Sequence, residues 1–293
     1  MAVRTTPANG IEIAYESFGQ RSGRPLLLVM GLGTQMLAWH EELCDTLAER
    51  GLFVVRFDNR DIGLSTHLHD APTPDVVAAF GGDLSSASYR LEDMADDTVG
   101  LLDALEIDRA HVVGASMGGM IAQTLAIAHP SRVRSLVSIM STPSPKIGGA
   151  TAEALAVLMA APATSREQAV ERVLAAYAVI GSPGYPLDEQ WLAGIAGESY
   201  DRGYDPLGVA RQLLAIHASG DRTEALRALR VPTLVVHGDA DPLVQLAGGQ
   251  ATAQAVPDAE LMVLQGMGHN LPRELWPAIV DGIVRVADRA DQG

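Results

Sequence analysis

The chain has 293 residues, of which 47% are apolar and 19% are charged, a composition typical of a folded globular protein. Acidic residues outnumber basic ones 36 to 21, so the formal charge of −15 disfavours binding to nucleic acids and to anionic membranes. The single cysteine, Cys44, excludes an internal disulfide and any zinc site built from several thiolates.

Short apolar runs of strand length alternate with longer amphipathic segments along most of the chain. The expected strands are Leu26–Met30, Phe53–Phe57, His111–Gly114, Val133–Met140, Pro232–His237 and Leu261–Leu264, with Glu12–Glu16 as an antiparallel edge strand. The helices expected between and after them are Met36–Arg50, Leu91–Leu105, Met117–Ala128, Leu246–Val256 and Pro272–Ala287. Continuous apolar strands that alternate with helices predict an α/β fold, with a mostly parallel sheet flanked by helices.

The strand–helix alternation stops between Thr142 and Leu229. The sequence there predicts only helices, at Ala150–Ala160, Arg166–Ile180, Asp188–Ala196 and Pro206–Ala218. We therefore expect a core of residues 1–141 and 230–293, with an inserted α-helical cap at 142–229. Residues 142–229 are called the cap segment below.

The third expected strand runs into the sequence Gly114-Ala115-Ser116-Met117-Gly118, and a helix follows. This is the G-x-S-x-G pattern in a strand–turn–helix context, where the glycines make room for a sharply turned serine. The turn would hold the Ser116 hydroxyl at the carboxyl edge of the sheet. We predict that Ser116 is a nucleophile.

A serine hydroxyl needs a base within hydrogen-bond reach, and the base needs a carboxylate, in the chain order Ser, Asp, His for this architecture. Two later strands end in loops that carry these residue types. Asp241 is our choice for the acid, with Asp239 as the alternative, and His269 is our choice for the base. The other histidines are expected to be packed or surface residues.

The oxyanion of an acyl-transfer intermediate needs two backbone donors. We assign them to the N–H groups of Met117, directly after the nucleophile, and of Leu32, in a glycine-flanked loop after the first expected parallel strand. Because only backbone atoms act there, the side chains of both are expected to line the pocket. Further expected pocket residues are Gly31, Met140, Leu243 and Leu271.

Two other segments carry polar side chains with possible functions. His67-Leu68-His69-Asp70 has metal-like spacing, but no other cluster in the sequence completes a site, so we predict no metal and no cofactor. In the loop Asp58–Ser65, Arg60 and the two aspartates are expected to tie the loop to the core, because arginine favours paired carboxylates.

At these residues the chain resembles the α/β-hydrolase superfamily over essentially its whole length. Five segments carry the resemblance: Leu26–Gly33, Phe57–Ser65, Ala110–Met120, Val231–Val244 and Gly266–His269. Within it, the chain is similar to bacterial esterases of the aclacinomycin methylesterase type, which share Val29-Met30-Gly31, the Asp58–Ser65 loop and Gly266–His269. One departure is Met30-Gly31, where many relatives have His-Gly. The resemblance implies an α/β-hydrolase fold and ester hydrolysis by a Ser-His-Asp triad.

These observations predict a serine hydrolase that cleaves esters of hydrophobic acids, including methyl and other small-alcohol esters. The alternatives on the same fold are a C–C bond hydrolase, a lactonase and a cofactor-free haloperoxidase, and a ligand sensor is a further one. Met1–Pro7 lacks the apolar core of a signal peptide, and no apolar run reaches the ~18 residues of a membrane span. We expect a cytoplasmic bacterial protein, a monomer or homodimer, whose partner is a small hydrophobic ester.

Overall fold

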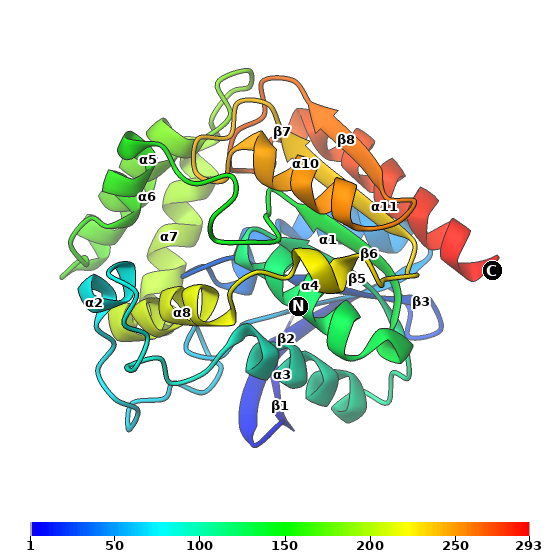
Figure 1. The fold of residues 1–293 in the computed structure, drawn as a ribbon, viewed down its shortest axis with the longest axis horizontal. Helices are drawn as coiled ribbons and strands as arrows, with labels where there is room; N and C mark the ends of the chain where they lie inside the picture. The colour runs from blue at the N-terminus through cyan, green and yellow to red at the C-terminus, as the bar shows by residue number, and fades with distance from the viewer. Residues whose placement is uncertain (1, 293) are drawn as a thin grey trace.

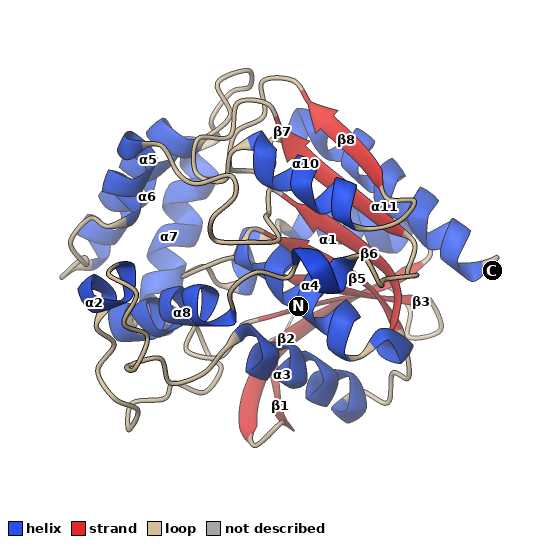
Figure 2. Cartoon of the chain, viewed as in Figure 1, coloured by secondary structure: helices blue, strands red, loops and turns tan. Residues whose placement is uncertain are grey.

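A computed structural model describes residues 2–292, and in them one eight-stranded sheet carries helices on both faces (Figure 1, Figure 2). The strands are β1 (Arg4–Ala8), β2 (Ile11–Phe18), β3 (Arg24–Val29), β4 (Leu52–Phe57), β5 (Ala110–Ala115), β6 (Val133–Ile139), β7 (Thr233–Gly238) and β8 (Glu260–Leu264). Their order across the sheet is β1-β2-β4-β3-β5-β6-β7-β8.

Strands β3 to β8 run parallel to one another in the sheet. The antiparallel pairs are β1 with β2 and β2 with β4. All six predicted parallel strands are present, with bounds shifted by at most two residues. Glu12–Glu16 lies in the antiparallel strand β2, as predicted, but its predicted place at the edge is wrong, because β1 pairs outside β2 and takes the edge. The sequence of β1, Arg-Thr-Thr-Pro-Ala, contains no apolar run, so it gave no strand signal.

Helices cover the sheet on both sides. Outside the cap segment they are α1 (Glu41–Glu49), α3 (Leu91–Ala104), α4 (Met117–Ala128), α10 (Leu246–Ala255) and α11 (Trp276–Asp291). The short helix α2 (Val76–Phe80) lies instead beside the helices of the cap segment (Figure 1). In the view of Figure 2, α3, α4 and α10 lie in front of the sheet, and α1 and α11 lie behind it.

The core follows from the alternation of side chains along the buried strands. On β3, Leu27 and Val29 pack into the cluster that includes α3 and α4. Leu26 and Leu28 point the other way, into the cluster that includes α1 and α11. Each fully buried side chain of this size stabilises the fold by about 1.5–3 kcal/mol. The two clusters hold the sheet rigidly, so the loops at its carboxyl edge have fixed starting points.

The cap segment holds five helices and no strand among its residues, all of which the structure describes. They are α5 (Ala152–Leu158), α6 (Arg166–Ile180), α7 (Glu189–Gly203), α8 (Pro206–Ser219) and α9 (Thr223–Leu226). Ser165, Asp188 and Asp205 cap the first turns of α6, α7 and α8 with side-chain oxygens. Helices α5 to α8 lie together beside the sheet (Figure 1). The domain boundaries at 141/142 and 229/230 stay a prediction.

Three predicted helices differ most from expectation. The predicted helix Pro272–Ala287 is instead a 3₁₀ turn at Arg273–Leu275 followed by α11, which ends at Asp291. Helix α7 continues to Gly203, past the predicted end at Ala196, and the predicted helix Met36–Arg50 is a short 3₁₀ turn followed by α1. Within residues 2–292 no helix combines the length and the apolar character needed to cross a bilayer.

Candidate active site

Ser116 occupies the sharp turn between β5 and α4. Its φ of 55° lies in the left-handed region, which non-glycine residues rarely adopt. Glycine is required beside it, because a Cβ on Gly114 would overlap the carbonyl oxygen of Gly118 and a Cβ on Gly118 would overlap that of Val29. The Ser116 N–H donates to the Ile139 carbonyl at 2.9 Å, which fixes the turn against β6. The backbone thus stores strain at this residue to expose its hydroxyl.

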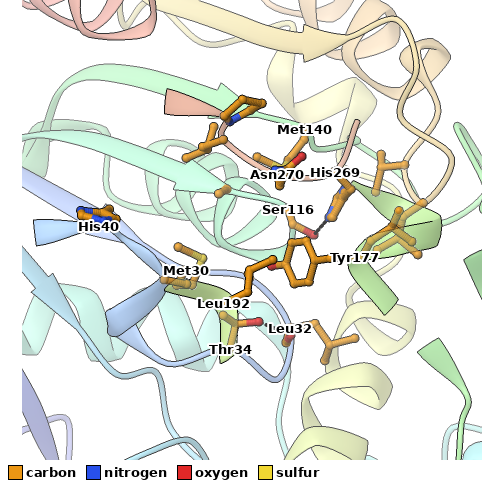
Figure 3. Close-up of a pocket in the computed structure, with 18 of the residues that line it drawn as sticks. Met30, Leu32, Thr34, His40, Ser116, Met140, Tyr177, Leu192, His269 and Asn270 are labelled. Carbon is orange, nitrogen blue, oxygen red and sulfur yellow. Dashed lines mark hydrogen bonds between the residues drawn. The ribbon is translucent and has the colours of Figure 1, made fainter. Parts of the chain in front are cut away.

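His269 lies between Ser116 and Asp241. Its Nε2 is 3.0 Å from Ser116 Oγ, and its Nδ1 is 2.8 Å from Asp241 Oδ2 (Figure 3). Asp241 and His269 are buried, at 4% and 8% exposure. Because the carboxylate accepts from Nδ1–H, a neutral imidazole presents Nε2 to the Ser116 hydroxyl as an acceptor. The arrangement provides a base in contact with the serine and a carboxylate that orients the base.

The loops after β7 and β8 hold these two groups in place. Asp241 Oδ1 accepts hydrogen bonds from the N–H groups of Leu243 and Val244 at 2.9 and 3.0 Å. The His269 N–H donates to the Ile180 carbonyl at 2.7 Å, so the end of α6 supports the histidine loop. Asp239 accepts instead from the Gly266 N–H at 2.7 Å and makes no hydrogen bond to His269. Of the two aspartates considered from the sequence, the structure brings Asp241 to the histidine.

The N–H groups of Leu32 and Met117 are both free of hydrogen-bond acceptors within residues 2–292. Gly31 packs against the nucleophile: a Cβ built on it would lie 3.5 Å from Ser116 Oγ. Leu32 directly follows Gly31 in the chain, so its N–H belongs to the residue next to the one that packs against the serine. Met117 directly follows Ser116. The side chain of Leu32 lines the cavity as expected, whereas the expectation for the Met117 side chain is wrong, because it points into the core and is fully buried.

A cavity of about 540 Å³ opens in front of Ser116 and His269. The predicted pocket residues Gly31, Met140, Leu243 and Leu271 all line it. Apolar walls from the cap segment were expected, but the sequence did not single out the residues that form them: Tyr177, Ile180, Leu187, Trp191, Leu192, Leu213 and Ile216. In Figure 3, Tyr177 and Leu192 point into the cavity from this side. Their apolar character was visible in the sequence, but their orientation depends on how the helices dock.

One end of the cavity, away from Ser116, is aromatic. The His40 ring stacks on Trp191 at a centroid distance of 5.0 Å and lies 5.1 Å from the Trp276 ring. The Arg273 guanidinium packs over Trp276 at 4.9 Å and pairs with Glu42 and Asp188. Burial, together with the charge of Arg273, lowers the pKa of His40. His40 is packed against these rings, one of the two alternatives expected for it, and it is also part of the cavity wall (Figure 3).

The Asp58–Ser65 loop has the structural role predicted for it, but two of its charges reach the cap segment. Arg60 makes two hydrogen bonds of 2.6 Å to the Asp97 carboxylate of α3. Asp58 pairs with Arg202 of α7 at 2.8 Å, and Asp61 pairs with Arg211 of α8 through two bonds of 2.8 and 2.9 Å. The loop therefore joins the core to two cap helices through buried charges.

His67 and His69 meet Asp205, which the sequence did not indicate as a partner. The ligand atoms of the three residues all lie within 4.8 Å of one another. His67 Nδ1 is 3.0 Å from Asp205 Oδ2 and its Nε2 is 3.0 Å from the Gly63 carbonyl oxygen. The Arg211 guanidinium also contacts Asp205 Oδ2, at 3.2 Å, and already supplies a positive charge there. The close approach of His67, His69 and Asp205 is therefore explained by hydrogen bonds that link the segment 67–69 to the start of α8.

Comparison with known proteins gives the family. A family model described as the alpha/beta hydrolase fold matches residues 24–272, so the chain belongs to the α/β-hydrolase family. The rhodomycin D methylesterase of Streptomyces sp. (strain C5) is 26% identical over 93% of each chain. The 3-oxoadipate enol-lactonase 2 of Acinetobacter baylyi is 28% identical and is aligned over 89% of this chain and 88% of its own.

A solved structure, that of the enol-lactonase from Burkholderia xenovorans, has the same fold, with a TM-score of 0.74 and 24% sequence identity. The alignment covers 97% of this chain and 99% of that one. These findings confirm the α/β-hydrolase fold and the resemblance to methylesterases. They also support a carboxylic ester hydrolase, the class of enzyme predicted from the sequence.

Proposed function

We propose that the protein is a serine esterase that hydrolyses carboxylic esters through an acyl-enzyme on Ser116. The observation that carries the proposal is the position of His269, which contacts both Ser116 Oγ and Asp241 Oδ2 at the wall of an apolar cavity. A structural serine in a tight turn needs neither a base nor a carboxylate behind it.

In the first step, Ser116 Oγ attacks the ester carbonyl carbon while His269 Nε2 takes the hydroxyl proton. The Asp241 carboxylate holds Nδ1–H and stabilises the imidazolium that forms. The negative charge on the carbonyl oxygen is bound by the N–H groups of Leu32 and Met117. When the tetrahedral intermediate collapses, His269 returns the proton to the oxygen of the departing alcohol.

In the second step, a water molecule attacks the acyl-enzyme, and His269 now takes the proton from that water. The second tetrahedral intermediate releases the carboxylic acid, and the proton passes from His269 back to Ser116 Oγ. The cycle needs no redox step and leaves the three side chains in their starting states.

The cavity sets the substrate class that we propose. Its walls near Ser116 are apolar, with Met30, Leu32 and Met140 from the core and Leu192 from the cap segment. A volume of about 540 Å³ lies within the range of sites for ligands of drug size. We therefore propose an ester whose acid part is hydrophobic and bulky, with methanol or another small alcohol as the leaving group, in keeping with the methylesterase relative.

The proposal is tested by Ser116→Ala, with Ser138→Ala as a matched control. Ser138 is also a buried serine, but it lies within β6 and bonds to Gln123 rather than to the site. With short p-nitrophenyl esters and methyl esters of bulky aromatic acids, we expect Ser116→Ala to lower kcat at least about 10⁴-fold. The control should stay close to the parent. A fluorophosphonate should label the parent once, on Ser116; activity of Ser116→Ala within tenfold of the parent would contradict the proposal.

A lactonase is the second candidate, and the similarity to a 3-oxoadipate enol-lactonase favours it. A lactone is a cyclic ester, so the same attack by Ser116 opens its ring without releasing a separate alcohol. Comparing kcat/KM for lactones, open-chain methyl esters and a vinylogous diketone separates the lactonase, the esterase and the C–C bond hydrolase. The esterase proposal requires the open-chain esters to be the best substrates.

A further inference from the structure

Gln212 of helix α8 reaches the loop that carries one of the proposed oxyanion donors. Its side chain is fully buried, with an exposure of 0%. Its Oε1 accepts a hydrogen bond from the Gly33 N–H at 2.9 Å, and its Nε2 donates to the Arg60 carbonyl at 2.8 Å. The amide therefore uses both ends to join the cap segment to two loops of the core.

The Gly33 contact falls in a tight turn from Gly31 to Thr34. The Thr34 N–H donates to the Gly31 carbonyl at 3.3 Å, and Gly33 has a φ of 65°. A positive φ at the third position is the mark of a type II turn and is readily adopted by glycine. In such a turn the central peptide, here between Leu32 and Gly33, can rotate to the type I arrangement unless it is held.

Both polar atoms of that central peptide are held. Gln212 accepts from its N–H, and the Thr34 hydroxyl donates to the Leu32 carbonyl at 3.0 Å. On the other side of Leu32, Gly31 packs closely against Ser116, so that a Cβ built on it would lie only 3.0 Å from the Ser116 Cβ. Leu32 is thus fixed between two anchored neighbours, and its own N–H is left with no acceptor among residues 2–292.

We propose that Gln212 is a positioning residue that holds the Gly31–Thr34 turn so that the Leu32 N–H faces the oxyanion. The inference rests on the proposed function of Ser116, and it assigns a catalytic consequence to a residue of the cap segment. Gln212 does not touch the reacting atoms; it acts through the backbone of Gly33. Helix α8 then has two roles, because its neighbouring residue Leu213 lines the cavity while Gln212 orders the oxyanion loop.

The identity of the residue fits this role. A side chain at this place needs an acceptor for the Gly33 N–H and a donor for the Arg60 carbonyl, both within a buried site. A glutamine amide supplies one of each without a charge. Arg211, on the same helix as Gln212, already attaches α8 to the core by pairing with Asp61 of the Asp58–Ser65 loop.

The test is Gln212→Met, which keeps the length of the side chain and removes both hydrogen bonds. Loss of an oxyanion donor typically lowers kcat about 10²–10³-fold, so a donor that is only loosened should cost about 10- to 100-fold. We expect KM to stay within about threefold, because ground-state binding does not use the oxyanion site. Affinity for a trifluoromethyl ketone, which forms an oxyanion on the serine, should fall in parallel with kcat.

The matched control is Gln123→Met. Gln123 is as buried as Gln212 and also bonds at both ends, to Ser138 and Arg222, but it does not touch the oxyanion loop. It should lower the melting temperature as Gln212→Met does, while kcat and ketone affinity stay within about threefold of the parent. A purely structural role for Gln212 would make the two variants alike.

Retention of full kcat and ketone affinity by Gln212→Met would overturn the inference, while loss of activity in Ser116→Ala would still uphold the proposed function. If Ser116→Ala stays active, the proposed function itself fails. Should Gln212→Met not fold, Thr34→Val removes the hydrogen bond at the other end of the same peptide without altering the cap segment. A lower kcat for Thr34→Val, with Ser116 still labelled by the fluorophosphonate, would support the inference. An unchanged kcat would overturn it.

Discussion

The Asp241 carboxylate is held by three hydrogen bonds in a buried site. Oδ1 accepts from two backbone N–H groups, those of Leu243 and Val244, and Oδ2 accepts from His269 Nδ1. His237 Nε2 lies 3.8 Å from the same Oδ2, but it is bonded to the Val244 carbonyl at 2.7 Å. With its own bonds fixed in this way, the carboxylate orients the imidazole of His269 before a substrate arrives.

Asp241→Asn should therefore lower kcat about 10⁴-fold, as the corresponding substitution does in serine proteases, because the amide no longer fixes the proton on Nδ1. Asp239→Asn is the matched control: it lies in the same loop but bonds to the Gly266 N–H. Its kcat should stay within about tenfold of the parent. Steady-state kinetics on one p-nitrophenyl ester checks both, and equal losses in the two variants would contradict the assignment.

At the scale of single residues, the sequence predicts the site residues that follow the ends of strands. It does not predict those that reach the site only when helices of the cap segment pack against the core. Ser116, Asp241 and His269 each follow an apolar strand closely, so the fold alone brings them to one edge. Gln212 lies in the middle of a helix, where nothing in the sequence separates a buried bridging amide from a solvated one. The same holds for His40, whose place in the cavity wall depends on two tryptophans far along the chain.

Among the elements, the Asp58–Ser65 loop is joined to three helices, α3, α7 and α8, through charged side chains. The Asp61 carboxylate is fully buried, at 0% exposure, and is bonded twice to Arg211. Burial by itself would raise the pKa of Asp61, but the hydrogen bonds from Arg211 and from the Leu68 N–H outweigh it, and the pKa is lowered. The ionised carboxylate therefore contributes stability above the ordinary aspartate pKa of about 3.9, and that contribution is lost as the pH falls below it.

Arg211→Met should destabilise the protein by about 3–5 kcal/mol at pH 7, because it leaves the Asp61 charge buried without its partner. Adding Asp61→Asn removes that charge and keeps an acceptor for the Leu68 N–H, so the double variant should regain a large part of the loss. Urea unfolding of the parent, the two single variants and the double variant measures the coupling. A double variant no more stable than Arg211→Met would contradict the account.

The sequence predicts elements best where an apolar pattern and a capping residue coincide. Helix α6 has the predicted bounds, Arg166–Ile180, because Ser165 caps its start and Gly181 follows its end. Helix α7 runs past the prediction because its last turns, Ser199 to Gly203, are polar and are held by Gln35, which donates to the Ser199 and Gly203 carbonyls. Such tertiary support does not appear in a local pattern.

For the whole molecule, histidines that are buried or half-buried should set how stability depends on pH. Burial is the main cause of a lowered pKa at His40, His111, His217 and His237, and for His111 the pKa falls to about 4. An unfolded histidine has a pKa of about 6.5, so between pH 6.5 and 4 the unfolded chain takes up protons that the folded chain does not. The stability present above pH 6.5 is therefore lost progressively through that window.

At pH 5 His111 alone should reduce the free energy of unfolding by about 2 kcal/mol relative to pH 7. Urea unfolding at the two pH values measures this loss, and His111→Gln, which cannot take up the proton, should show a difference between them that is smaller by about that amount. A parent protein equally stable at both pH values would contradict the assignment of the buried histidines.

The attachment of the cap segment has a consequence for how such enzymes diversify. The cap segment leaves the core after β6 and returns to it before β7, and these two strands are neighbours in the sheet. A different insertion can therefore be accommodated at this point without rearranging the strands. A chimera of this core with the insertion of a relative would inherit that relative's pocket walls. It would also inherit whatever side chain then faces the Gly33 N–H. Grafts should therefore be chosen first for an acceptor at this place and only then for the shape of the pocket.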